Sequence, residues 1–86
     1  MAPDPIDGRY EESERERRVV FEYDGQRVVL AQPTSGYAMV TVRAGEREVE
    51  QERYYGFDMA IDHAAELLGV DPSRLAVPEG ASDLGM

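Results

Sequence analysis

The fold is decided by residues 17–32, which read RRVVFEYDGQRVVLAQ. Within this stretch the dipeptide Asp24-Gly25 separates two segments that are rich in Val and aromatic side chains. Asp-Gly between two such segments is typical of a β-hairpin with a two-residue turn. A turn of this length places Glu22 directly across from Arg27, and opposite charges at facing positions stabilise an antiparallel pair. We therefore predict a hairpin with this register.

Two-residue alternation continues on the C-terminal side of the hairpin, and a helical spacing follows it. We expect antiparallel strands over residues 17–23, 26–32, 37–43 and 46–54. After Gly56 the apolar residues recur at helical intervals up to the stop signal Gly69: Phe57, Ile61, Ala64 and Leu68. The predicted fold class is α+β: a four-stranded antiparallel β-meander packed against one C-terminal α-helix, in the order ββββα.

A chain of 86 residues has room for a single domain. Residues 1–12 contain Pro3, Pro5 and Gly8 and are predicted to be a disordered leader. We expect the α+β domain to span residues 13–76 and a mobile tail to span residues 77–86.

The charge composition predicts the surroundings of the protein. All nine basic residues are Arg, and eighteen Asp and Glu residues give a net charge of −9. Such a small domain repels itself unless salt screens its charges, so we expect a halophile. With no cysteine, no signal peptide and no membrane-spanning stretch, we place it in the cytoplasm. We expect no nucleic-acid partner, because Arg15, Arg17 and Arg18 alternate with glutamates.

The alternation makes both faces of the predicted sheet apolar in the middle. Val19, Phe21, Val28 and Leu30 lie on one face, and one helix can cover only that face. With a four-residue turn after the second strand, the other face carries the predicted partner interface: Val20, Val29, Val40, Val42 and Val49. We predict a homodimer through this face, because two-fold dimers are the commonest oligomers. A register one residue different would move the valines of the third and fourth strands to the other face. Charged groups over that face in a single chain would remove the basis for the dimer.

Chemistry-bearing residues are few. The predicted helix carries His63 beside three carboxylates at four-residue spacing, Asp58, Asp62 and Glu66. These residues could hold a divalent cation, although the paired-His spacing of helical metal sites is missing. With one His and no Cys, a catalytic triad would need Ser13, Ser35, Ser73 or Ser82, and none lies in a nucleophile elbow. We expect neither a cofactor nor an enzyme. The aromatic residues near the strand-to-helix junction form either a ligand platform or half-buried packing: Tyr54, Tyr55 and Phe57, with Tyr23 and Tyr37.

Two further stretches carry a resemblance. They are residues 53–69, RYYGFDMAIDHAAELLG, and residues 81–86, ASDLGM. From about Arg17 onward the chain resembles a family of short, acidic, uncharacterised proteins of halophilic archaea, and this resemblance implies no activity, cofactor or binding residue. The leading functional hypothesis is a non-catalytic protein-interaction module. The alternative is a small-ligand or divalent-metal binder that uses the acidic and His face of the helix.

Overall fold

The computed structural model describes residues 4–34 and 39–84. The hairpin at its centre joins β3 (Glu16–Tyr23) to β4 (Gln26–Pro33) through a turn in which Asp24 and Gly25 both have positive φ. Positive φ at both central residues defines the type I′ turn. Glu22 pairs with Arg27, so the predicted register is confirmed.

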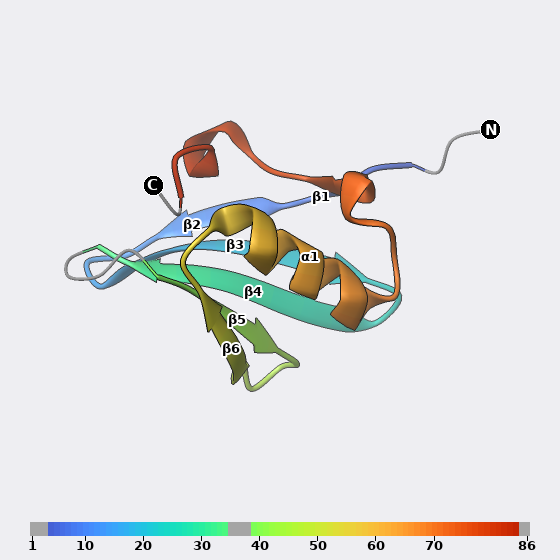
Figure 1. Ribbon diagram of the computed structural model, residues 1–86, viewed down its shortest axis with the longest axis horizontal. Helices are drawn as coiled ribbons and strands as arrows, with labels where there is room; N and C mark the ends of the chain where they lie inside the picture. Colours follow the sequence, from blue (N-terminus) through green and yellow to red (C-terminus); the bar gives the residue numbers. More distant parts are fainter. Residues whose placement is uncertain (1–3, 35–38, 85–86) are drawn as a thin grey trace.

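The complete sheet has five antiparallel strands in the order β2-β3-β4-β5-β6, and one helix packs on one face of it (Figure 1). The remaining elements of this layer are β2 (Arg9–Glu12), β5 (Val40–Ala44), β6 (Val49–Tyr54) and α1 (Phe57–Leu68). The α+β class and the antiparallel meander followed by a C-terminal helix are therefore confirmed, with one strand more than predicted.

The N-terminal segment contains two strands where a disordered leader over 1–12 was predicted. β1 (Ile6–Asp7) pairs in parallel with β7 (Leu75–Ala76), and β2 pairs with β3. Gly8, between β1 and β2, makes this path possible: a Cβ atom there would lie 2.8 Å from Val19 Cγ1 and 2.9 Å from Phe21 Cε1. The predicted disordered leader was therefore wrong for residues 4–12. This segment pairs with β3 and β7, and Gly8 lets its backbone lie close against the core.

The C-terminal segment is also packed, although a mobile tail was predicted over 77–86. After η1 (Pro72–Arg74) and β7, the chain forms η2 (Glu79–Ala81), and both Ala81 and Leu84 are buried in the same core as the alanines of α1. The segment therefore covers the helix face of the sheet and leaves the opposite face to other groups. Residues 85–86 lie outside the described part.

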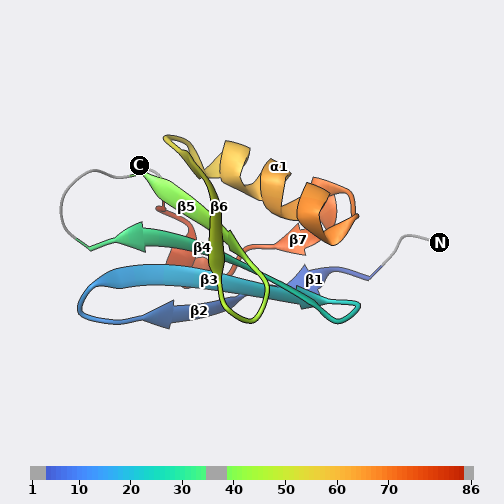
Figure 2. The ribbon, with the colours of Figure 1, turned by 90° about the horizontal axis from the view of Figure 1, so that it is seen from below.

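The second hairpin differs from its prediction. β6 begins at Val49 and pairs Val49 with Ala44 and Glu50 with Arg43, where we expected Glu46 across from Arg43. Val42 pairs with Glu52, so Gln51 is an extra residue in β6, as in a β-bulge. A bulge increases the local twist, and Figure 2 shows β6 crossing in front of β3 and β4 on the side away from α1.

The main core lies between the sheet and α1. It contains Phe21 and Leu30 from the first hairpin, Val40 and Val42 from β5, and the alanines on the inner side of α1. Gly69 ends the helix with a φ of 72°, as its position predicted. None of the helices in the described residues has the length and apolar composition needed to cross a bilayer.

Candidate functional site

The five valines of the predicted interface do not lie together. Leu30 pairs with Val42, so Val42 and Val40 point to the helix face and are fully buried in the main core. Val49 faces the same side and is 56 % exposed. The expected common face was therefore wrong: a four-residue turn would place Val29 across from Val40, but Val29 pairs with Arg43, and this odd shift of three residues moves the valines of β5 to the other face. Only Val20 and Val29 occupy the opposite face, where they form a second small core with Ala31 and are already buried.

Charged side chains gather on this opposite face. The ion pairs join four arginines to four glutamates, which we name the Arg–Glu network: Arg9, Arg18, Arg27, Arg43, Glu11, Glu16, Glu22 and Glu48. Equal numbers of both charges make the network neutral inside a strongly acidic protein. The long hydrocarbon stems of arginines can cover apolar surface while their charged ends stay in water. The network thus lies over the face through which the sequence predicted that a second chain would bind.

Arg18 is at the centre of the network. Its Nη1 and Nη2 donate to the two carboxylate oxygens of Glu48 at 2.7 and 2.8 Å, and its Nε donates to Glu11 at 3.1 Å. Arg43 makes a second two-point contact, with Glu16, at 2.9 and 3.0 Å. The planar guanidinium matches a carboxylate with two parallel hydrogen bonds, which the ammonium of lysine cannot do.

The ion pairs also close a ring. Arg9 contacts Glu11 at 3.0 Å and Glu22 at 3.5 Å. Arg27 contacts Glu22 at 3.7 Å and Glu48 at 3.3 Å. Arg18 completes the ring between Glu48 and Glu11. Arg27 is its loosest member, since its buried Nε has no hydrogen-bond partner among the described residues.

Glu48 holds the second hairpin over this face. It lies in the turn before β6 with a φ of 52°, a left-handed conformation that costs a non-glycine residue about 1–2 kcal/mol. Its carboxylate reaches across β4 to Arg18 on β3. The two-point contact therefore fixes a strained turn in the position that covers the second core.

The network also shifts the ionisation of its members. Hydrogen bonds from Arg43, more than the charges of Arg43 and Arg18, lower the pKa of Glu16, although partial burial opposes the shift. The hydrogen bond from Arg18 likewise lowers the pKa of Glu48. In return, Glu48 raises the pKa of Arg18. Both carboxylates are therefore held in their charged form. An ion pair requires this form, whereas a general acid must carry a proton.

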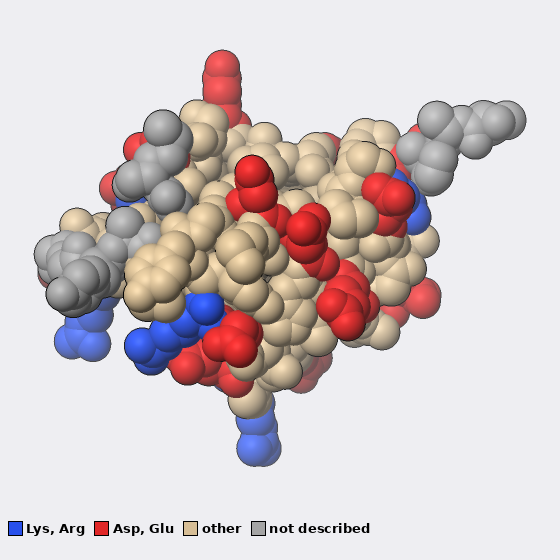
Figure 3. Space-filling model, in the orientation of Figure 1, with Lys and Arg blue, Asp and Glu red and all other residues tan. Residues whose placement is uncertain are grey.

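The predicted metal ligands remain apart. In the described ranges no three His, Asp or Glu side chains are placed to hold one metal ion. His63 Nδ1 lies 3.0 Å from the Tyr54 hydroxyl, and the two rings meet edge to face. Asp58, Asp62 and Glu66 are exposed, and Figure 3 shows carboxylates along the outer side of α1.

The serines have structural partners. Ser13 Oγ accepts hydrogen bonds from the backbone N–H groups of Arg15 and Glu16 in the turn before β3. Ser73 donates to Asp71 at the start of η1. The Nδ1 atom of His63 is hydrogen-bonded to Tyr54 on β6. Ser35 lies outside the described residues. Within the described residues, no hydrogen bond joins a serine to His63.

Neighbouring arginines point to opposite faces. Arg17 lies on the helix face, where it donates to Asp83, the Gly80 carbonyl and the Tyr10 hydroxyl, whereas Arg18 lies in the network. Strand alternation separates the two side chains. The arginine run of the sequence does not form a basic patch.

The aromatic residues of the junction are also divided. Tyr54 packs on His63, Phe57 packs against the main core, and Tyr55 is 77 % exposed. Tyr23 lies under the Arg74 guanidinium at the far hairpin. Tyr37 lies outside the described residues. These side chains favour the packing interpretation for Tyr54 and Phe57, whereas Tyr55 is exposed.

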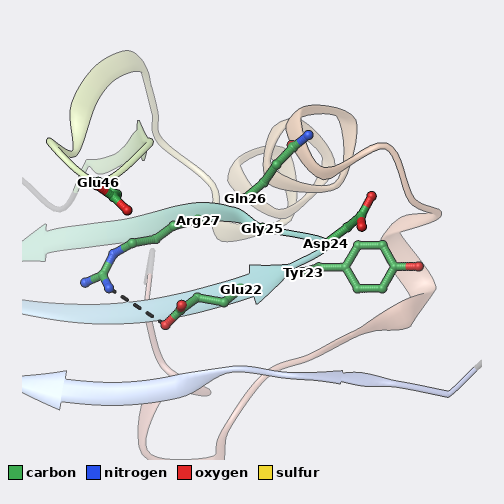
Figure 4. A pocket seen from close by; sticks show the side chains of 7 residues that line it. All are labelled: Glu22, Tyr23, Asp24, Gly25, Gln26, Arg27 and Glu46. Carbon is green, nitrogen blue, oxygen red and sulfur yellow. Dashed lines mark ion pairs between the residues drawn. The ribbon is translucent and has the colours of Figure 1, made fainter.

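A surface hollow that the sequence did not indicate lies between the tips of the two hairpins. It consists of two adjoining parts of about 340 and 330 Å³ that share Gly25, Gln26, Arg27 and Glu46, and we name it the hairpin hollow. Its other lining residues are Glu22, Tyr23, Asp24, Val28, Ala44, Gly45 and Leu67. Figure 4 shows Asp24 on the first hairpin tip, Glu46 on the second, and Arg27 directed toward Glu22. The hollow exists because of the position of the second hairpin relative to the first. No local sequence pattern predicts this position.

Comparisons with known proteins place the chain in a family without assigning it an activity. Neither the curated proteins nor the solved structures contain a match. A family model of unknown function, DUF7111, matches residues 1–86. The chain belongs to this family of unknown function.

Proposed function

We propose that this protein is a non-catalytic protein-interaction module. The supporting observation is the exposure of three large apolar side chains within residues 49–59. Tyr55 is 77 % exposed, and Met59 and Val49 are each 56 % exposed. We name the surface around Tyr55 and Met59 the β6–α1 margin; Val49 lies at the other end of β6, about 20 Å away along the strand. Tyrosine and methionine are enriched at protein interfaces, while glutamate and aspartate are depleted there. On so acidic a chain the margin is the surface best suited to a partner.

Affinity capture from a native extract near molar salt tests this proposal. The bait is the purified protein, compared with a Tyr55→Ser/Met59→Ser variant and with a Val77→Ser control that removes a half-exposed apolar residue elsewhere. We expect one protein to be retained by the wild type and the control and lost by the double variant. Repeated recovery of the bait alone, or equal retention by all three, would contradict the proposal.

The homodimer stays a prediction, and so does the salt-rich cytoplasm. Val20 and Val29 are covered within one chain, so the sheet-face route would require the Arg–Glu network to open. A light-scattering mass at 0.1 M and at 1 M salt tests self-association. A dimer that survives Val49→Ser would not depend on the one exposed valine of the predicted interface.

The alternative of a metal binder has no cluster of ligands behind it in the described residues. Calorimetric titration with zinc, manganese and calcium decides it directly. Heat that disappears in His63→Ala would restore this function, whereas no heat from either protein would remove it.

A further inference from the structure

We propose that the hairpin hollow receives a lysine or arginine side chain of a protein partner, so that the partner segment is basic. This inference rests on the proposed interaction function and adds the chemistry of the partner. Three features carry it: an apolar floor, carboxylates without ion-pair partners at the rim, and a continuous path from the β6–α1 margin.

The floor of the hollow suits a hydrocarbon stem. Val28 from β4, Ala44 from β5 and Leu67 from α1 line one part of it, together with the glycines of both hairpin tips. Val28 is almost fully buried and the other two are partly exposed. Lysine and arginine side chains lie with their stems on such surfaces and keep their charged ends in water.

The rim supplies the opposite charge. Three carboxylates line the first part of the hollow, those of Glu22, Asp24 and Glu46, against one cation, Arg27, and Glu46 also lines the second part beside the apolar floor. Arg27 is already engaged with Glu22 at 3.7 Å and with Glu48 at 3.3 Å. Asp24 and Glu46 form no ion pair with the described residues. The uncompensated charge is therefore negative, and it favours a cation over an anionic ligand.

The hollow suits an organic cation better than a metal ion. Metal ions need several ligand oxygens converging at about 2.0–2.6 Å, and the described residues contain no group of three such ligands. A guanidinium or ammonium group instead presents several hydrogen-bond donors and can bridge carboxylates that are spread around a hollow.

The hollow is connected to the proposed partner surface along α1. Met59, His63 and Leu67 recur at intervals of four residues, so they follow one side of the helix. Met59 belongs to the β6–α1 margin and Leu67 lines the hollow. Eight residues of helix span about 12 Å. One partner segment can therefore place an apolar side chain at the margin and a basic side chain in the hollow.

The test uses small probes whose charge alone differs. N-acetylarginine methylamide and its neutral isostere N-acetylcitrulline methylamide are titrated into the ¹⁵N-labelled protein at low salt, and amide shifts are followed by NMR. We expect the arginine probe to move the amides of Gly25, Gln26, Gly45 and Glu46, with an affinity about three- to tenfold above that of the citrulline probe.

A matched pair of variants separates the hollow from general charge attraction. Asp24→Asn/Glu46→Gln removes the two rim charges, and Asn-Gly keeps the type I′ turn. Asp62→Asn/Glu66→Gln removes the same charge from the outer side of α1. Loss of the shifts in the first variant alone supports the inference. Equal loss in both variants, equal affinity for both probes, or no shifts at the hollow overturns it. None of these outcomes depends on the capture experiment at Tyr55 and Met59, so the two proposals fail separately.

Discussion

The two faces of the sheet are buried by different means. On the helix face, large side chains such as Phe21 and Leu30 pack under α1 and the C-terminal segment. On the opposite face, the small core of Val20, Val29 and Ala31 lies in a region that the Arg–Glu network crosses. One face relies on contact between apolar side chains, and the other combines a thin apolar layer with paired charges.

This difference shows why an antiparallel sheet with two apolar faces does not have to recruit a second chain. Such sheets usually leave one face solvated. Here the second face is closed by the curl of the β5–β6 hairpin, which Glu48 ties to Arg18 on β3. The two faces should therefore differ in their contribution to stability and in their response to pH and salt.

The largest expected effect is on the helix face. Phe21→Ala should lower the free energy of unfolding by about 3–5 kcal/mol, because a fully buried aromatic ring is removed and a cavity is left. Val29→Ala, at an equally buried position on the other face, should cost roughly 1–3 kcal/mol. Urea unfolding followed by far-ultraviolet circular dichroism measures both.

An 86-residue domain has a total stability of about 4–13 kcal/mol, so Phe21→Ala could leave too little folded protein to measure. Phe21→Leu then provides the milder version of the same change. The inequality of the two faces is broken if Val29→Ala costs as much as Phe21→Ala, or more than the same change at Val28, which is buried on the helix face.

The next effect concerns the centre of the network. Arg18→Met keeps much of the stem that covers the second core but leaves Glu48 without its two-point contact. We expect a loss of about 1–2 kcal/mol, between the values typical of exposed and of buried ion pairs. Arg18→Lys should recover only part of it, since an ammonium cannot form the fork.

A double-mutant cycle with Glu48→Gly sharpens this comparison. Glycine relieves the positive φ at position 48 but loses the carboxylate. If the fork holds the strained turn, Arg18→Met should cost clearly less in the Glu48→Gly background than in the wild type. Additive effects would mean that Arg18 acts on the second core without fixing the turn.

The pH dependence of the unfolding free energy should also arise from the network face. The pKa values of Glu16 and Glu48 are lowered in the folded protein, so their stabilising contribution is present above the ordinary glutamate pKa of about 4.3. It is lost as the pH falls from there through the lowered values. The difference in unfolding free energy between the wild type and Glu16→Gln should therefore be large at pH 7 and shrink toward pH 3.

Glu12→Gln is the control for the pH experiment, because it changes the same charge on an exposed side chain outside the network. At pH 7, the unfolding free energy of Glu12→Gln should differ from that of the wild type by less than that of Glu16→Gln does. A Glu16→Gln difference that stays constant from pH 7 to pH 3 would contradict an ion-pair role.

Local signals were enough for the elements that local chemistry determines. Asp24-Gly25 specified a turn and with it the register of β3 and β4, and Gly69 specified the end of α1. The charged residues of the second face could also be assigned to it, because Glu16, Arg18, Val20 and Glu22 share one parity in β3. Their partners on the other strands could not.

The rest depended on features that arise only in three dimensions. The face of Val40 and Val42 follows from the path between β4 and β5, where one residue of register moves every side chain to the other face. β2 is polar, and its pairing with β3 places Glu11 across from Arg18 and Glu12 across from Arg17. The reach of Glu48 to Arg18 requires a positive φ that its residue type does not predict.

The smallest expected effect separates the two faces by salt. Asp62 has like charges four residues away on both sides, Asp58 and Glu66, and each such pair destabilises a helix by about 0.2–0.5 kcal/mol. Asp62→Asn should therefore stabilise the protein by a few tenths of a kcal/mol at 0.1 M salt, and the gain should vanish at 1 M, where the screening length falls to about 3 Å. Loss of the exposed network contact in Glu11→Gln should show the opposite sign, a cost at low salt that diminishes at high salt. Paired urea titrations at both salt concentrations give the unfolding free energy of each variant. The variant whose effect changes more with salt shows whether repulsion on α1 or attraction in the network sets the salt response of the whole domain.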